Sequence, residues 1–222
     1  MSSSGVVDQF SLLGGPLHRL GCRLGLVRGR SDTLLVGIAL GATSWLIGVI
    51  LAGVGGTLPT LLSLNVIGAH VRLLVAIPLL FACESALDPQ IRMFVRYCVH
   101  SGVIPAGALP EFAAEIARTT RWSNAWLPEA AFLALAIVLC VTAPQLPWGG
   151  ATSTFDPRLA GSMAGWWYWV FCLTLFRFLT LRWLWRLGLW ARFLWRLSRM
   201  PLHLMAAHAD AAGGLGILEK VQ

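Results

Sequence analysis

Among the charged residues inside long apolar stretches of the sequence, three stand out: Glu84, Glu129 and Arg177. Charged groups in hydrocarbon are costly, so they usually pair with one another or line a path for water or ions. Glu84 and Arg177 are expected in the same half of the bilayer, with a height difference of about 6 Å that a long arginine side chain can cover. The sequence predicts a Glu84–Arg177 ion pair, with separate snorkelling of both charges to the inner interface as the alternative. Glu129 is expected in the first turn of a helix, where the helix dipole favours a carboxylate.

The carboxyl-terminal tail holds a second group of residues with chemical potential: His208, Asp210, Gly213, Gly214 and Gly216. A histidine and a carboxylate two residues apart could bind a metal or relay a proton, and a glycine run lets backbone amides approach an anion. These are too few ligands for a metal centre, so a polar interfacial turn before another helix is the favoured interpretation. No metal and no cofactor is expected.

The composition is that of an integral membrane protein. Of the 222 residues, 57% are hydrophobic and 12% are charged, whereas soluble domains have about one-quarter charged residues. The formal net charge of +7 comes from arginines at the edges of apolar stretches. It indicates a bilayer with anionic headgroups as the partner and argues against nucleic acid. The five cysteines show no metal-type spacing.

Four windows reach the length of about 20 residues that is needed to cross a hydrocarbon core about 30 Å thick. They cover residues 33–55, 66–87, 128–147 and 164–186. The predicted fold class is all-α, a polytopic α-helical membrane protein with four transmembrane helices and amphipathic interfacial helices. The chain then divides into a basic cytoplasmic segment 1–32, a four-helix membrane domain 33–187 with a cytoplasmic helical link 88–127, and a basic interfacial helix with a glycine-rich tail 188–222.

Lysine and arginine residues predict the orientation of these spans. Four precede the first span, none lies in residues 57–69, four lie in the link 88–127, one lies in residues 148–163, and five arginines follow between residues 182 and 199. Basic flanks therefore alternate with nearly neutral ones. By the positive-inside rule both termini are expected in the cytoplasm.

Small residues form one stripe along the first span. They recur every three or four residues as Gly37, Gly41, Ser44, Gly48 and Ala52. Such a stripe lets another helix approach closely. It could serve as a dimer face or a pore-lining groove, but ordinary packing inside one bundle is the favoured interpretation.

The link 88–127 is expected to contain two short amphipathic helices on the cytoplasmic side. The pattern of the first ends at Gly102. The second begins with Pro110 at its first position, and Glu115 can pair with Arg118 at i,i+3.

The fourth span is expected to continue as a helix to Met200, so that residues 163–200 would measure about 57 Å. Roughly half of this helix must leave the hydrocarbon core. Trp183 and Trp190 belong to its apolar face, and an opposing arc carries Arg182, Arg186, Arg192, Arg196 and Arg199. This pattern predicts a helix lying in the inner interface, with its guanidinium groups on anionic headgroups.

The chain also resembles an uncharacterised family of multi-spanning bacterial inner-membrane proteins. The resemblance is carried by a Trp/Arg-rich helix followed by a His-x-Asp-x-Ala-Gly-Gly-Leu-Gly tail, in segments 166–168, 176–186, 193–199 and 208–216. The family has Thr-His-Pro-Asp where this chain has Ala207-His208-Ala209-Asp210. Members usually continue past the glycine run with further spans. The chain therefore resembles the amino-terminal half of a member, as expected for a truncated form. The resemblance implies fold and location, with no activity attached.

Two function classes follow from these features. In the first, a transport or channel-type protein, Glu84 and Arg177 line a polar path between helices. In the second, a non-catalytic scaffold, the small-residue stripe and the basic helix assemble a homo-oligomer or a membrane partner. A polar cavity reaching Glu84 would favour transport, and a closed bundle would favour the scaffold. An enzyme is not expected, because no nucleophile with an adjacent base appears.

Overall fold

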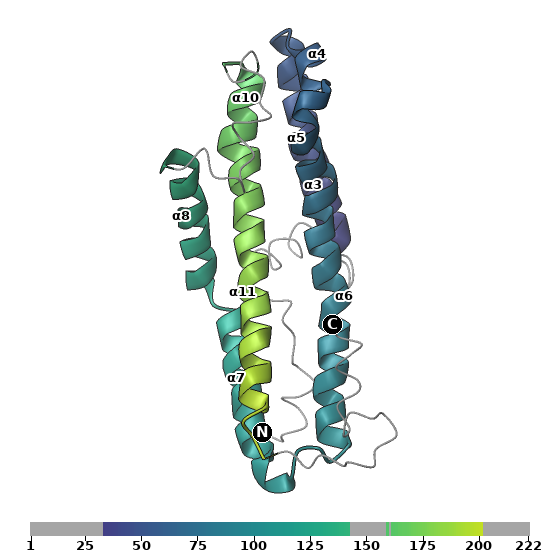
Figure 1. Cartoon of the computed structure of the whole chain (residues 1–222), viewed down its shortest axis with the longest axis vertical. Coiled ribbons are helices and arrows are strands. Elements are labelled where there is room, and N and C mark those ends of the chain that lie inside the picture. Colours follow the sequence, from purple (N-terminus) through teal and green to yellow (C-terminus); the bar gives the residue numbers. More distant parts are fainter. Residues whose placement is uncertain (1–32, 143–158, 160, 202–222) are drawn as a thin grey trace. The chain divides into compact units, whose positions relative to one another are not determined.

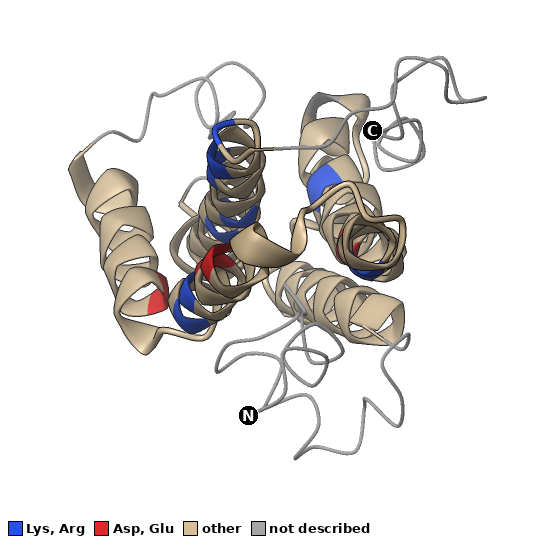
Figure 2. Ribbon diagram, turned by 90° about the horizontal axis from the view of Figure 1, so that it is seen from below, with Lys and Arg blue, Asp and Glu red and all other residues tan. Residues whose placement is uncertain are grey.

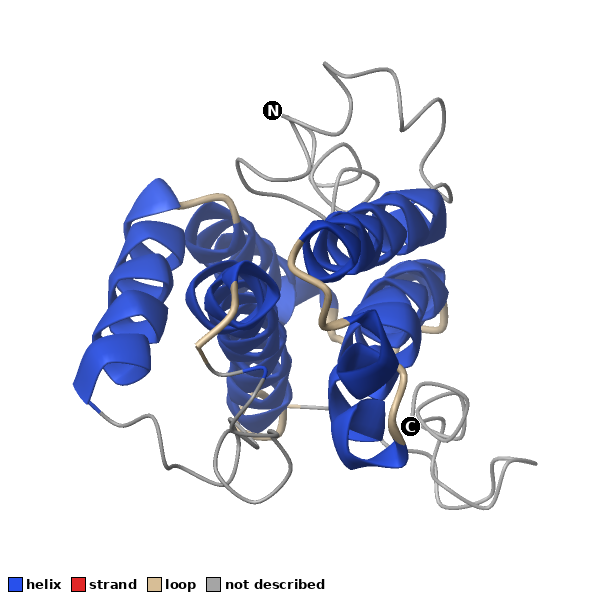
Figure 3. Cartoon of the chain, turned by 90° about the horizontal axis from the view of Figure 1, so that it is seen from above, coloured by secondary structure: helices blue, strands red, loops and turns tan. Residues whose placement is uncertain are grey.

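The computed structural model describes residues 33–142, 159 and 161–201, and within these ranges every regular element is helical (Figure 1, Figure 3). The predicted all-α class is therefore confirmed. The elements in chain order are α3 (Thr33–Val54), α4 (Leu58–Leu61), η1 (Leu64–Val66), α5 (Ile67–Val71), η2 (Arg72–Ala76), α6 (Ile77–His100), η3 (Ala106–Ala108), α7 (Leu109–Ser123), α8 (Trp126–Thr142), α10 (Met163–Trp167), η5 (Tyr168–Leu173) and α11 (Thr174–Leu197).

Among the described residues, three helices are long and apolar enough to cross a membrane: Thr33–Val54, Ile67–His100 and Met163–Leu197. They correspond to the first, second and fourth predicted spans. The third predicted span is represented by α8, which is helical to Thr142, while residues 143–147 lie outside the described residues. A fourth crossing is counted if α7 and α8, with the residues just before α7, form one broken span.

The sequence predicted that the second span ends near residue 87, but the helix continues past that point. Helix α6 continues to His100 with Pro89 in its interior, so the second span and the first link helix are one helix. A proline removes one backbone hydrogen bond and normally interrupts a helix. Here the turns beyond it are held by tertiary packing, because Phe94, Val95 and Cys98 are fully buried. The predicted end of the pattern is confirmed by Gly102, whose φ of 72° suits glycine.

A π-helical segment interrupts the α-helical geometry near the start of this second span. In η2 the Ile77 N–H donates to the carbonyl oxygen of Arg72, five residues earlier. Pro78 follows immediately and has no N–H to donate. The wider turn in front of Pro78 changes the register of the backbone hydrogen bonds without breaking the helix.

The chain forms two compact units. The α3 unit comprises residues 33–83 and 126–184, and the α7 unit comprises residues 84–125 and 185–201, within the described ranges. Helices α6 and α11 each begin in the α3 unit and end in the α7 unit.

The α7 unit has its own hydrophobic core. Side chains from α6, α7 and the end of α11 form one buried cluster around Phe94, Phe112, Ile116 and Phe193. The ring of Phe193 lies 5.9 Å from that of Phe112 and 5.5 Å from that of Trp190, centroid to centroid. The first contact joins α11 to α7, and α6 is joined to α11 by the Phe94 and Trp190 rings, whose centroids are 5.8 Å apart.

The α3 unit has the opposite distribution of apolar side chains. Large hydrophobic residues face outward, with Val54 80%, Leu64 82% and Val141 76% exposed. Within residues 33–83, 126–142, 159 and 161–184 only four residues are Asp, Glu, Lys or Arg; they are Arg72, Glu129, Arg177 and Arg182. Figure 2 colours the charged positions on the ribbon. An apolar outer surface with few charges is what a lipid environment requires.

Candidate functional site

Glu84 forms an ion pair inside the α7 unit, with a partner that the sequence did not predict. The Arg186 Nη1 atom lies 2.8 Å from Glu84 Oε2, and the two side chains are 9% and 7% exposed. The predicted Glu84–Arg177 pair is therefore wrong in its second member. Arg186 comes more than two helical turns after Arg177 on α11, and the sequence pattern assigned it to the arc facing lipid headgroups.

Glu129 is also paired, within the α3 unit. Its Oε1 atom lies 3.3 Å from Arg182 Nε, and the Arg182 and Glu129 side chains are 4% and 12% exposed. Glu129 does stand in the first turn of α8, where the helix dipole was expected to stabilise it. The dipole is supplemented by a cation from a segment 53 residues away in sequence.

These two pairs correct the predicted faces of α11. Arg182 and Arg186 were expected to reach lipid headgroups, yet they are buried, while the apolar Leu184 and Leu187 are 43% and 45% exposed. The inversion has a physical reason. Lipid satisfies an apolar side chain as well as a protein core does, whereas a buried arginine needs a counter-charge that Glu84 and Glu129 supply.

Farther along α11 the prediction of exposed basic residues is met. Arg196 and Arg199 are exposed, and their guanidinium carbons lie 5.7 and 5.2 Å from the centroid of the Trp195 ring. Trp183 and Trp190, assigned to the apolar face, are half-buried.

In the described part of the chain, Arg177 is a buried cation without a counter-charge. It is 4% exposed, and its Nη1 and Nη2 atoms have no hydrogen-bond partner. No carboxylate in the described ranges forms an ion pair with it. A buried, unpaired guanidinium carries a large desolvation cost, so its retention calls for an explanation.

Two residues that the sequence reasoning missed lie in the same unit. Arg72 opens the π segment η2, Tyr168 opens the π segment η5, and Arg72 Nη1 donates a hydrogen bond of 2.7 Å to the Tyr168 hydroxyl. Arg177 acts electrostatically on the same hydroxyl. Segments of π-helix occur frequently at functional sites. The sequence signals that could have indicated this contact are Pro78 and the presence of Arg72 and Tyr168 in otherwise apolar helices.

The small-residue stripe of α3 is used for packing within the chain. A Cβ atom added at Gly37 would lie 2.8 Å from the Phe81 ring, and one added at Gly41 would overlap the carbonyl oxygen of Leu73. On the same stripe the Ser44 carbonyl accepts a 3.0 Å hydrogen bond from the Trp167 indole. The remaining members of the stripe are Gly48, which is half-buried beside Trp167, and Ala52, which is fully buried. This arrangement agrees with the favoured interpretation of ordinary helix packing.

A second polar connection joins α3 to α5. Trp45 Nε1 donates to His70 Nδ1 at 2.8 Å, and His70 Nε2 lies 2.8 Å from the Leu61 carbonyl oxygen. Because an indole nitrogen only donates, Nδ1 accepts in the first contact, which leaves Nε2 to donate to the Leu61 carbonyl oxygen. The imidazole therefore fixes the connection between the first two spans and is not placed for metal binding.

The tail residues His208, Asp210, Gly213, Gly214 and Gly216 lie outside the described residues. In the part of the chain that is described, no cluster of three or more His, Cys, Asp or Glu side chains could hold a metal ion. No family model, no curated protein and no solved structure matches the chain. The resemblance to an inner-membrane family accordingly stays a prediction.

Proposed function

We propose that the chain is an integral protein of the bacterial inner membrane, with both termini in the cytoplasm, that transports or conducts an anion. The alternation of basic and neutral flanks supports this orientation, and the family resemblance supports the location. The apolar outer surface of the α3 unit is consistent with residence in lipid.

The observation that carries the proposal is the state of Arg177. Its neighbours on α11, Arg182 and Arg186, are buried beside carboxylates, whereas Arg177 is equally buried and its terminal nitrogens have no partner. An anion that binds beside such a buried guanidinium offsets its desolvation cost. The sign of the charge selects the class of solute.

Arg72 and Tyr168 extend this positive region. Neither Arg72 nor Arg177 forms an ion pair with a carboxylate in the described ranges, so the α3 unit holds two uncompensated positive charges near one phenol. Arginine side chains on a helix point towards its amino end, which directs Arg177 towards Tyr168. Two guanidinium groups and a phenol are suited to bind a small carboxylate, phosphate or halide.

The scaffold alternative has lost one of its two arguments. Gly37 and Gly41 would have to face a partner helix, but their surfaces are covered by Phe81 and Leu73 of the same chain. The proposed path also does not involve Glu84, because that carboxylate is paired with Arg186.

The test is flux into proteoliposomes across a panel of chloride, phosphate, acetate and succinate, with sodium and potassium as cation controls. Wild-type protein is expected to move at least one anion above the protein-free background. Arg177→Gln should abolish that flux, and Arg177→Lys should retain part of it because the charge is kept. The matched control is the double variant Glu129→Gln/Arg182→Gln, which removes a neutral pair and should leave anion selectivity unchanged. Absence of flux for every solute, or equal flux with Arg177→Gln, would overturn the proposal and favour the scaffold.

A further inference from the structure

The α7 unit contains a cavity whose lining includes neither Glu84 nor Arg186. It has a volume of about 530 Å³ and lies between α7 and α11. Its lining consists of Arg118, Trp122, Trp185, Gly188, Leu189 and Arg192. Two arginines and two tryptophans around one cavity make a site that is both cationic and aromatic.

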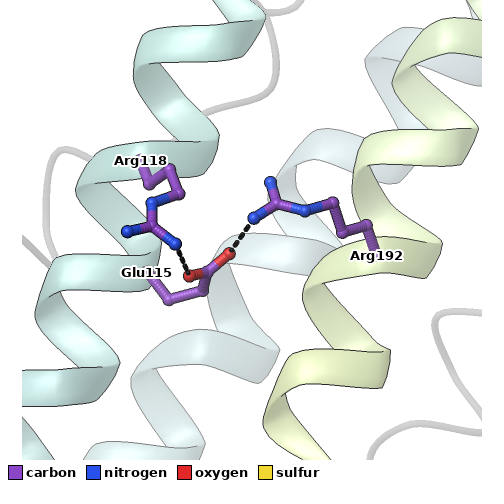
Figure 4. A network of polar contacts seen from close by, with 3 residues as sticks. All are labelled: Glu115, Arg118 and Arg192. Carbon is purple, nitrogen blue, oxygen red and sulfur yellow. Dashed lines mark hydrogen bonds and ion pairs between the residues drawn. The ribbon is translucent and has the colours of Figure 1, made fainter.

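One carboxylate holds both arginines in place (Figure 4). Glu115 accepts from Arg118 Nη1 at 3.4 Å with one oxygen and from Arg192 Nη2 at 3.0 Å with the other. The i,i+3 pair with Arg118 was predicted, and the long-range pair with Arg192 was not. Because a single carboxylate neutralises one of two guanidinium groups, the cluster keeps a net charge of about +1.

Arg118 and Arg192 have exposed N–H donors that Glu115 does not use, so they can bind a further anionic group. The Glu115 side chain is 8% exposed, whereas the Arg118 and Arg192 side chains are 55% and 36% exposed. Each guanidinium carries five N–H donors, and Glu115 uses one nitrogen of each. The buried carboxylate thus orients two positively charged forks towards the open side of the cavity.

The aromatic wall is consistent with a position at the membrane surface. The Trp122 and Trp185 rings meet edge to face with centroids 6.3 Å apart. Trp185 follows the start of its helix at Met163 by 22 residues, or about 33 Å, which exceeds the hydrocarbon thickness of about 30 Å. Tryptophan is enriched at this depth.

We propose that this cavity binds the phosphate group of an anionic phospholipid. The charge is complementary, and arginine forks suit a phosphate. The proposal does not depend on anion transport, because it concerns other residues and another readout.

The test measures lipid retention by the full-length protein with native mass spectrometry, using phosphatidylglycerol and phosphatidylcholine at equal concentration. Wild-type protein is expected to retain phosphatidylglycerol at least tenfold more strongly. Arg118→Gln and Arg192→Gln should each weaken this retention by about tenfold, the effect of one charge-assisted hydrogen bond. Arg199→Gln, at an exposed arginine outside the cavity, is the matched charge control and should leave retention unchanged.

A second variant tests the cavity without changing any charge. Nothing lies within 4 Å of a Cβ added at Gly188, so Gly188→Leu should fold and fill the space. It is expected to lower phosphatidylglycerol retention about tenfold. Equal retention of the two lipids, an equal loss with Arg199→Gln, or full retention with Gly188→Leu would overturn the proposal. Displacement of the lipid by millimolar inorganic phosphate would identify free phosphate as the ligand and overturn the lipid assignment.

Discussion

Replacing Arg177 by leucine is expected to stabilise the folded protein. Arg177 is 4% exposed and its terminal nitrogens have no partner, and an arginine at the centre of a membrane helix costs about 2.5–3.5 kcal/mol. Arg177→Leu removes that cost. Arg182→Leu is the matched comparison on the same helix, because it removes the ion-pair partner of Glu129, whose side chain is only 12% exposed. Breaking a buried pair in this way costs about 3–5 kcal/mol.

The two variants should therefore shift the melting temperature in opposite directions. For a chain of this length 1 kcal/mol corresponds to about 2–4 °C. Arg177→Leu is expected to raise the melting temperature by roughly 10 °C, and Arg182→Leu to lower it by a similar amount. The assay is thermal unfolding of the purified protein in one detergent, monitored by circular dichroism.

The same assay links stability to the proposed anion. At ten times its dissociation constant a bound anion stabilises the folded state by about 1.4 kcal/mol. Wild-type protein should gain this increment from the anion that it transports, and Arg177→Leu should not. If Arg177→Leu destabilised the protein as strongly as Arg182→Leu does, Arg177 would be a satisfied structural residue, and the reasoning from its missing partner would be refuted.

Two further predictions concern packing and pairing. Gly41→Ala should strongly reduce the yield of folded, monodisperse protein in size-exclusion chromatography, because the added Cβ overlaps a backbone carbonyl, while Gly53→Ala, with open space around it, should not. Charge reversal at Glu84 or at Arg186 alone should lower membrane abundance, measured by immunoblot, and the double reversal should restore it. Restoration by a double reversal of Glu84 and Arg177 instead would show that the observed pairing is wrong.

Much of the helical framework could be predicted from local sequence. The start of α7 beside Pro110, the turn at Gly102 and the Glu115–Arg118 contact all depend on residues close in sequence, so they were predicted correctly. The end of the second span was not predicted correctly. Pro89 normally ends a helix, and only contacts with α7 and α11 keep the helix intact beyond it.

The pairing of charges could not be predicted from the sequence. Depth in the membrane predicted Arg177 as the partner of Glu84, yet Glu84 pairs with Arg186 and Glu129 pairs with Arg182. Which arginine meets which carboxylate depends on the rotation and register of helices that are distant in sequence. The contact between Arg72 and Tyr168 depends on the same features, and no periodicity indicated it.

The sequence by itself determined that the chain is helical, that its apolar stretches are long enough to cross a membrane, and that a few charges lie within them. These properties depend on composition and on length along the chain. Only the tertiary structure decided which face of α11 is buried and that Arg177 is left without a counter-charge. The physical reason is that lipid and protein satisfy apolar side chains equally well, so hydrophobic periodicity does not show which face packs inward. The ion pairs do show it, because Glu84 and Glu129 each meet an arginine on the buried side of α11.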